Sequence, residues 1–426
     1  MEMKSKEKVF TKYQVFIIAV LAVLQFTIVL DFMVLSPLGA ILLKELDIST
    51  SQFGLVVSAY AFSAGASGLL AAGFADKYDR KKLLMFFYTG FILGTALCAM
   101  APNYSLLLIA RIITGIFGGV ISSVSFAIIS DLFKLEVRGK VMGFVQSAFA
   151  GSQVFGIPVG LLLADKFGWH APFWLIVGFG LALGIIIMAY MKPVDAHLQI
   201  KSDRNALQHL FKTLRNRDYI KAFTGTTLLA TGGFMLMPFA AAFCVYNVGI
   251  TNQQLTLLYF ITGVFSMIFG PIIGSMSDKA GKYQTFVVGS LISMVMVVIY
   301  TNLGITPLWI LISVNVVLFV GIASRMISAS ALITAMPSLQ DRGAFMSVNS
   351  AVQQISGGIA AAIAGLIAMK HSSGRIEHYD TLGYLVVLTM IIAMGLFYVI
   401  NRHIQKNAQS ADASPVVSEV LSSDPL

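Results

Sequence analysis

Charged residues are scarce in this chain, since Asp, Glu, Lys and Arg make up only 12% of its 426 residues. Ordinary soluble domains are about one quarter charged. A soluble protein of this length needs charged side chains over its whole surface, so the composition excludes that class. Hydrophobic residues make up 57%, with 37 glycines and 31 phenylalanines. Small residues let helices approach in a membrane, and apolar rings can face lipid.

Cysteine is nearly absent, and no cluster of residues that could carry catalysis is present. Cys98 and Cys244 lie in apolar runs without metal-binding or redox spacing, which favours two small buried hydrophobic residues. The six histidines show no metal spacing, and no Gly-rich loop precedes a Lys-Ser/Thr pair. We therefore expect no metal, no cofactor, no ATP drive and no enzymatic activity.

Long apolar runs dominate the chain, and twelve of them reach the length of about 20 residues that crosses a bilayer. They cover 14–38, 52–74, 83–101, 105–131, 140–164, 171–191, 220–247, 253–276, 284–302, 308–335, 344–369 and 382–402. The longest polar stretch, 192–219, separates two bundles at 14–191 and 220–402. Tails at 1–13 and 403–426 flank them, and the second tail, rich in Ser, Asp and Pro, is expected to be disordered. The predicted fold class is an all-α membrane protein with two six-helix bundles.

Basic residues predict the orientation in the membrane. The segments on one side of the predicted spans, both tails among them, hold nearly all the Lys and Arg residues. The opposite segments hold only Lys44, Lys166, Lys370 and Arg375. Cytoplasmic loops are the ones enriched in Lys and Arg. Both termini are therefore expected in the cytoplasm, and the protein is expected in the inner membrane. The net charge of +9 thus reflects orientation and does not indicate a nucleic-acid partner.

The two halves repeat each other at a nearly fixed offset. Residues 72–82 (AGFADKYDRKK) follow span two, and residues 274–282 (GSMSDKAGK) follow span eight, 202 positions later. Arg138-Gly139 after span four likewise matches Arg342-Gly343 after span ten, at an offset of 204. Parallel six-span repeats are one of the transporter plans, with the solute site between the halves near the bilayer midplane.

At these residues the sequence resembles the major facilitator superfamily, whose signature loop reads Gly-x-x-x-Asp-(Arg/Lys)-x-Gly-(Arg/Lys)-(Arg/Lys). The second copy fits this pattern, whereas Ala72 and Asp79 stand in the first copy where glycines are usual. The resemblance implies the major facilitator fold and loops that latch one conformation, although simple anchoring by the basic residues is the alternative. The expected gating residues are Asp76, Lys77, Arg80, Lys81, Asp278, Lys279, Gly281 and Lys282.

Two opposite charges are expected at one depth inside the membrane, where ionisable residues usually have a function. At 1.5 Å per residue, Asp31 in span one and Arg111 in span four both lie about 10 Å below the outer surface. Arg111 opens a segment (RIITG) that resembles the family's Arg-x-x-x-Gly pattern, which is linked to proton coupling. A carboxylate that alternates between a desolvated site and an Arg partner can bind and release a proton. The alternative is a static ion pair that only fixes helix packing.

Other polar residues in the spans are candidates for the solute cavity. Gln146 and Gln153 share one face of span five, and Asn349 and Gln353 share one face of span eleven. They either face each other across the cavity or join neighbouring helices. Arg325 in span ten is expected to bind an anionic group, to bond to carbonyls at a helix end, or to extend to the inner surface, and Tyr60 is a weaker candidate.

Span five carries a hinge-like segment, GIPVG, with Gly156, Pro158 and Gly160. Proline interrupts helical hydrogen bonding, and glycines permit bending. The segment resembles the antiporter motif of efflux members, but Ile157 separates the glycine from the proline. The resemblance implies a monomeric, proton-coupled antiporter that exports a small hydrophobic or amphipathic solute. The alternatives are a proton symporter or facilitator for sugars, nucleosides or other metabolites and, more remotely, a membrane receptor or integral membrane enzyme.

Overall fold

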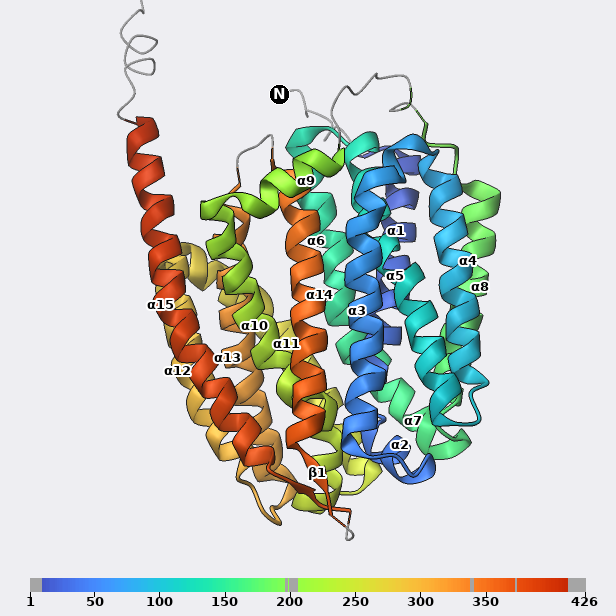
Figure 1. Ribbon diagram of the computed structural model, residues 1–426, viewed down its shortest axis with the longest axis vertical. Helices are drawn as coiled ribbons and strands as arrows, with labels where there is room; N and C mark the ends of the chain where they lie inside the picture. Colours follow the sequence, from blue (N-terminus) through green and yellow to red (C-terminus); the bar gives the residue numbers. More distant parts are fainter. Residues whose placement is uncertain (1–9, 196–197, 199–205, 338–340, 372–373, 413–426) are drawn as a thin grey trace, which may run out of the picture.

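Two helix bundles stand side by side in the computed structural model, which describes residues 10–195, 198, 206–337, 341–371 and 374–412 (Figure 1). The first bundle contains α1 (Lys12–Val34), α2 (Gly39–Glu45), α3 (Thr50–Phe74), η1 (Ala75–Lys77), α4 (Arg80–Ala99), α5 (Tyr104–Leu132), α6 (Leu135–Gly151), η2 (Ser152–Gly156), α7 (Ile157–Phe167) and α8 (Ala171–Tyr190). The second contains α10 (Arg217–Phe243), η4 (Cys244–Val248), α11 (Asn252–Ala280), α12 (Lys282–Thr301), α13 (Leu308–Thr334), α14 (Arg342–Ile367) and α15 (Tyr379–Asp412). The helix α9 (Ala206–Arg215) lies between them in sequence and packs on α14, α10 and α3.

Within the described residues, eleven helices are long and apolar enough to cross a membrane. The twelfth crossing consists of α6, η2 and α7, which follow one another without a break from residue 135 to residue 167. The prediction of an all-α membrane protein with twelve spans is therefore confirmed.

The repeat extends to the way in which the helices begin. Ser49 caps α3 in a capping box with Gln52, and Thr251 caps α11 in the same way with Gln254. A capping box satisfies two of the backbone N–H groups that a helix start leaves unpaired. The same device at the same offset indicates that the two bundles repeat each other in structure as well as in sequence.

Span five changes its helical winding at the predicted hinge. Pro158 lacks the N–H group that a regular helix needs. Just before it, residues 152–156 form a π-helical turn, in which the N–H of Ile157 donates to the carbonyl of Ser152, five residues back. Such turns are rare and frequently occur at functional sites. Gly156 and Gly160 lie on the side chains of Leu30 and Val34 in α1, so this turn packs against the helix that carries Asp31.

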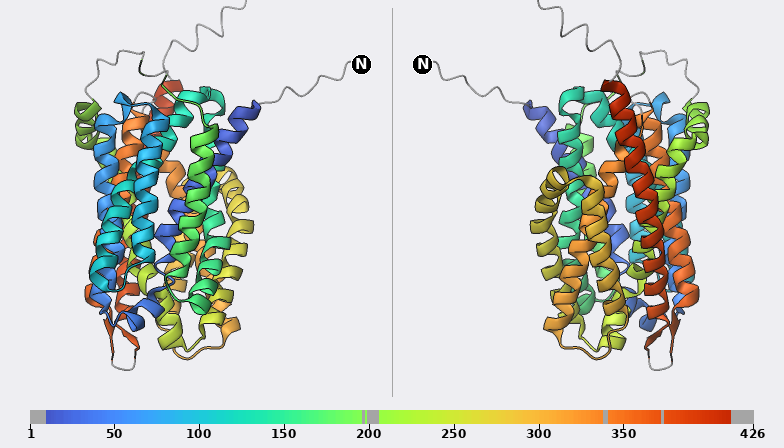
Figure 2. Two further views of the ribbon diagram at one scale, coloured as in Figure 1. Left: turned by 90° about the vertical axis from the view of Figure 1, so that its right-hand side faces the viewer. Right: turned by 90° about the vertical axis from the view of Figure 1, so that its left-hand side faces the viewer.

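The bundles share a hydrophobic core at only one end of the molecule. We call the end where α1 begins and α15 ends the termini side, and the opposite end, with the antiparallel strands β1 (Met369–Lys370) and β2 (Ile376–Glu377), the hairpin side (Figures 1 and 2). On the hairpin side a single core joins residues of both bundles, with the rings of Phe53 and Phe239 5.9 Å apart. Toward the termini side each bundle has a core of its own. The described conformation is thus closed on the hairpin side.

Three hydrogen bonds between the bundles reinforce this closure, and we call them the hairpin-side latch. The Tyr246 hydroxyl donates to the Ala40 carbonyl at 2.8 Å, the Lys370 ammonium donates to the Leu43 carbonyl at 2.6 Å, and the Thr50 hydroxyl donates to the Ala368 carbonyl. Two of the acceptors belong to α2, so this short helix is held by the second bundle. Opening toward the hairpin side requires all three bonds to break.

Replacing Lys370 with Met is expected to raise the population open on the hairpin side about three- to tenfold, because one hydrogen bond contributes about 0.5–1.5 kcal/mol. Spin labels on the exposed residues Glu45 and Glu377 report the distance between the two sides of the latch in pulsed EPR. Arg375→Met, at an exposed cation of the same hairpin, is the control and should leave the distribution unchanged. Equal distributions for Lys370→Met and the wild type would contradict the latch.

Candidate functional site

Asp31 and Arg111 form a fully buried ion pair in the first bundle. Both side chains have 0% exposure, and Nη1 of Arg111 lies 2.7 Å from Oδ2 of Asp31. The same nitrogen lies 3.4 Å from the main-chain carbonyl of Asp31. The shared depth predicted from the spans therefore corresponds to a direct contact between α1 and α5.

Two further side chains complete the surroundings of this pair. The Thr95 hydroxyl of α4 lies 3.1 Å from Oδ1 of Asp31, and it lies 3.0 Å from the carbonyl of Phe91. The Tyr60 ring of α3 lies under the guanidinium of Arg111, with 4.4 Å between the guanidinium carbon and the ring centre. A cation over an aromatic face is attracted by the ring quadrupole, most strongly where water is excluded. Four helices of one bundle thus contribute to the site.

Arg111 is only partly satisfied by these contacts. Its Nε and Nη2 are buried without a hydrogen-bond partner among the described residues. Burying a charged group costs free energy unless its donors are paired. Two donors of the guanidinium are therefore left open to a partner that the described residues do not supply.

Glycines of α5 allow α3 to approach closely enough for the Tyr60 contact. A methyl group at Gly118 would lie 2.8 Å from the Tyr60 hydroxyl and 3.3 Å from the Phe91 ring. A methyl group at Gly115 or Gly119 would meet the α3 backbone itself. The Gly-rich segment that begins at Arg111 therefore seats Tyr60 against the ion pair.

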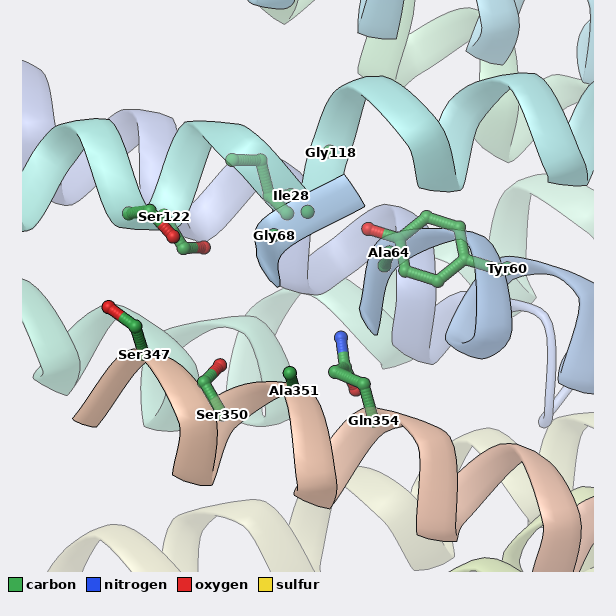
Figure 3. Close-up of a pocket in the computed structure, with 12 residues that line it drawn as sticks. Ile28, Tyr60, Ala64, Gly68, Gly118, Ser122, Ser347, Ser350, Ala351 and Gln354 are labelled. Atoms are coloured by element: carbon green, nitrogen blue, oxygen red, sulfur yellow. The ribbon is translucent and has the colours of Figure 1, made fainter. Parts of the chain in front are cut away.

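A cavity of about 50 Å³ lies between the two bundles, with the Tyr60 hydroxyl in its wall (Figure 3). That volume holds a few water molecules. Residues of α14 form the wall on the side of the second bundle, and the amide of Gln354 points toward the same space as the Tyr60 hydroxyl (Figure 3). The lining residues are Ile28, Tyr60, Ala64, Gly68, Gly118, Gly119, Ser122, Ser123, Ser347, Ser350, Ala351 and Gln354.

The second bundle has a neutral counterpart of the charged site. At the offset of the repeat, Tyr60 corresponds to Thr262 and Arg111 to Asn315. Nδ2 of Asn315 donates to the Thr262 hydroxyl at 2.8 Å, and both side chains are buried. No acid stands at 233–235, where the counterpart of Asp31 would lie. The repeat therefore keeps a polar contact in both bundles but places charge in only one.

The predicted cavity amides are distributed over different environments. Asn349 accepts a hydrogen bond from the Thr226 hydroxyl of α10, which corresponds to the interhelical alternative. Gln153 and Gln353 are half-buried and are not among the residues that line the cavity. The side chain of Gln146 lies outside the described part of the structure. Gln354, next to a predicted residue, is the amide that lines the cavity, and the prediction missed it because helical spacing alone does not fix which face looks inward.

Among the described residues, spans five and eleven are not packed closely against each other. Instead α14 packs closely along α3, while η2 and α7 pack on α11. Gly263 of α11 approaches the backbone of Val154 in η2. The contacts between the bundles thus pair span two with span eleven and span five with span eight.

Arg325 lies in α13 with 4% exposure, and its Nε and Nη2 have no hydrogen-bond partner among the described residues. It is not one of the residues that line the described cavity. The roles considered for it, an anionic contact, bonds to helix-end carbonyls and extension to the surface, stay predictions.

The first signature loop holds its own bundle together on the termini side. Arg80 bonds Asp131 of α5 at 3.1 Å and the carbonyl of Ala75 at 2.8 Å. Asp79, where the family pattern has glycine, accepts from the backbone N–H groups of Lys82 and Val194. The departure from the pattern therefore has a structural reason, because this carboxylate caps α4 and anchors the segment after α8.

The remaining loop residues predicted for gating are mostly at the surface. Lys81 donates to the carbonyls of Met188 and Met191 at the end of α8. The side chain of Asp76 lies outside the described part of the structure. Gly281 has φ +99°, a left-handed conformation that favours glycine. The exposed residues are Lys77, Asp278, Lys279 and Lys282.

The chain is similar to transporters along nearly its whole length. It is 26% identical over 380 residues to the Uncharacterized MFS-type transporter YceJ of Bacillus subtilis (strain 168), covering 88% of this chain and 94% of that protein. It is 34% identical over 155 residues to Multidrug resistance protein 3 of the same organism, covering 36% of this chain and 30% of that protein.

Solved structures share the fold at low identity. A bacterial homolog to the human lysosomal transporter Spinster, in an inward-facing and unoccupied conformation, has a TM-score of 0.73 at 15% identity, covering 93% of this chain and 98% of that chain. A D-xylose-proton symporter has a TM-score of 0.73 at 18% identity, covering 89% of this chain and 97% of that chain. The model of the Major Facilitator Superfamily matches residues 21–229 and 222–426. These matches cover most of the chain, and it belongs to the major facilitator superfamily.

Proposed function

We propose that this chain is a proton-coupled antiporter that exports a small hydrophobic or amphipathic solute by alternating access. It would lie in the inner membrane with both termini in the cytoplasm, so the hairpin side would face outward. The observation that carries the proposal is the buried Asp31–Arg111 pair directly behind the wall of the cavity between the bundles.

The coupling follows from the surroundings of Asp31. In the described state its carboxylate is paired with Arg111 and hidden from solvent on the closed hairpin side. When the bundles rock open toward the outside, water reaches the carboxylate, which takes up a proton and releases Arg111. Closure restores the pair and delivers the proton to the other side. Each cycle therefore moves a proton inward while the solute moves outward.

The direction of solute movement rests on two observations. The π-helical turn of span five stands where efflux members of the family have their antiporter motif, and it packs on α1 beside Asp31. The relative named Multidrug resistance protein 3 matches this chain over 155 residues. Both favour export.

Proton symport or facilitated movement of a sugar or nucleoside is the second candidate. Solved structures of a D-xylose-proton symporter and of the nucleoside transporter NupG share the fold of this chain. At 18% and 14% identity these structures support the fold and leave the solute open.

An imposed pH gradient separates these candidates. The purified chain is reconstituted in proteoliposomes and tested with labelled chloramphenicol, uridine and D-xylose. An acidic lumen should drive accumulation by an antiporter, and a protonophore should abolish it. Accumulation only when the exterior is acidic indicates symport. Equilibration of the solute that is the same for either direction of the pH gradient indicates a facilitator. Either of these results contradicts antiport.

A further inference from the structure

The cavity and the ion pair share one side chain. Tyr60 has 2% exposure, its ring lies on the Arg111 guanidinium, and its hydroxyl is part of the cavity wall (Figure 3). That hydroxyl has no hydrogen-bond partner in the described part of the chain. Since this hydroxyl faces the cavity, a molecule in the cavity can supply its hydrogen-bond partner.

The remaining wall of the cavity restricts what that molecule can be. Among the described residues, its polar side chains are hydroxyls and one amide, and none of the lining side chains is charged. A charged group placed there would lose its hydration without gaining a partner of opposite charge. All hydrogen bonds of a hydroxyl, amide or carbonyl group of the bound molecule can be satisfied there, because Ser, Tyr and Gln side chains donate as well as accept.

We propose that this cavity binds an uncharged, hydrogen-bonding group of the solute and that Tyr60 is the positioning residue that transmits its presence to the Asp31–Arg111 pair. The proposal rests on the proposed function, because it assigns a solute group to the cavity of the same coupled transporter. The rest of an amphipathic solute would extend toward the apolar side chains of the neighbouring helices.

The transmission has a simple geometric basis. The Tyr60 ring is confined between Arg111 and the ring of Phe32, whose centre lies 5.2 Å away. Phe32 in turn contacts Phe234 of the second bundle at 5.6 Å. A solute group that enters the cavity and contacts the ring therefore shifts it across the guanidinium, which weakens or strengthens the contact of Arg111 with Asp31. Movement of the second bundle reaches the same ring through Phe32.

Two substitutions separate the roles of the hydroxyl and the ring. Tyr60→Phe removes the hydroxyl and keeps the ring, so the KM for a neutral solute in counterflow should rise about three- to tenfold. The pH profile of gradient-driven transport should stay as in the wild type. Tyr60→Leu removes both, so the ratio of driven transport to counterflow should fall and the pH profile should shift. Tyr88→Phe is the matched control, because this buried tyrosine of α4 is not among the residues that line the cavity.

Gly118→Ala tests the geometry independently. Its added methyl group would lie 2.8 Å from the Tyr60 hydroxyl, so this variant should show reduced coupling. Combining it with Tyr60→Phe removes that contact, and the double variant should behave like Tyr60→Phe alone. A double variant that stays as poorly coupled as Gly118→Ala would show that the glycine acts through another contact.

The solute class is tested by thermal stabilisation of the purified full chain. Chloramphenicol, uridine and D-xylose are the uncharged probes, and ethidium is the permanent cation. At least one uncharged probe should raise the Tm, and Tyr60→Phe should diminish the shift. Any of three results overturns the assigned solute group. Only ethidium raises the Tm, no probe raises it, or an uncharged probe raises it as much in Tyr60→Phe as in the wild type. An unchanged ratio of driven transport to counterflow in Tyr60→Leu overturns the transmission.

Asp31→Asn distinguishes this inference from the proposed function. If Asp31→Asn removes driven transport and keeps counterflow, while the Tyr60 variants behave like the wild type, only the role of Tyr60 is wrong. If driven transport survives in Asp31→Asn, proton coupling at this site is wrong whatever the Tyr60 variants show.

Discussion

Replacing Asp31 with Asn is expected to reduce transport driven by a pH gradient to the level of protein-free liposomes, while solute counterflow continues. Asn has the shape of a protonated Asp but cannot exchange a proton, so it arrests the step at which the driving ion is bound or released. Its carbonyl oxygen can still accept from Arg111, which lies 2.7 Å from the carboxylate in the wild type. The measurement is uptake of labelled solute in proteoliposomes, with and without an imposed gradient.

The persistence of counterflow makes this test specific. Counterflow requires a folded protein that exchanges its solute but needs no net proton movement, so its loss would point to a folding defect. Asp195→Asn, at an exposed residue outside the buried site and outside the signature loops, serves as the control and should keep most of the driven transport. Undiminished driven transport in Asp31→Asn would falsify the carrier role and leave the static ion pair as the explanation.

Replacing Arg111 with Leu is expected to destabilise the first bundle severely, by about 3–5 kcal/mol, because it leaves a buried charge without its partner. Asp31 has 0% exposure, and the Thr95 hydroxyl is the other side-chain group bonded to it in the described structure. The expected effect differs from that of Asp31→Asn. The proposed cycle includes a state with a protonated, neutral Asp31, whereas Arg111 keeps its charge throughout the cycle. The measurement is the melting temperature of the purified protein in detergent.

The double variant Asp31→Asn/Arg111→Leu provides the matched comparison. With both charges gone, no uncompensated ion remains, so its Tm should lie above that of Arg111→Leu alone. Equal melting temperatures for the single and double variants would show that the loss comes from packing around the guanidinium, including its contact with Tyr60.

The architecture of this protein follows largely from its sequence, because membrane crossing imposes a simple length rule. Uninterrupted apolar runs predicted the spans, whereas the orientation expected from the basic residues stays a prediction. The structure adds the interruption in span five. Pro158 predicted an interruption of the helix, but the π-helical form of that interruption depends on packing against α1 and α11.

The site was only partly predictable. Depth along two spans was enough to place Asp31 beside Arg111, because each residue advances a helix by a fixed rise. The contributions of Thr95 and of the Tyr60 ring depend on how α3 and α4 are rotated about their own axes. A repeat offset carries no information on that rotation, which is set by the close approach of helices at glycines such as Gly118.

The confinement of the buried acid to one bundle limits the energetics of the proposed transport. Asp31 is the single acid well inside a span among the described residues, and Thr262 with Asn315 gives the second bundle no site of its own for a proton. One carboxylate can carry one proton in each turnover. In the proposed antiport, exchange for a neutral solute would then move one net charge across the membrane, and a voltage of 100 mV would contribute about 2.3 kcal/mol to it. That voltage alone sustains a concentration ratio of about 50, whereas exchange for a monovalent cation is electroneutral and gains nothing from it.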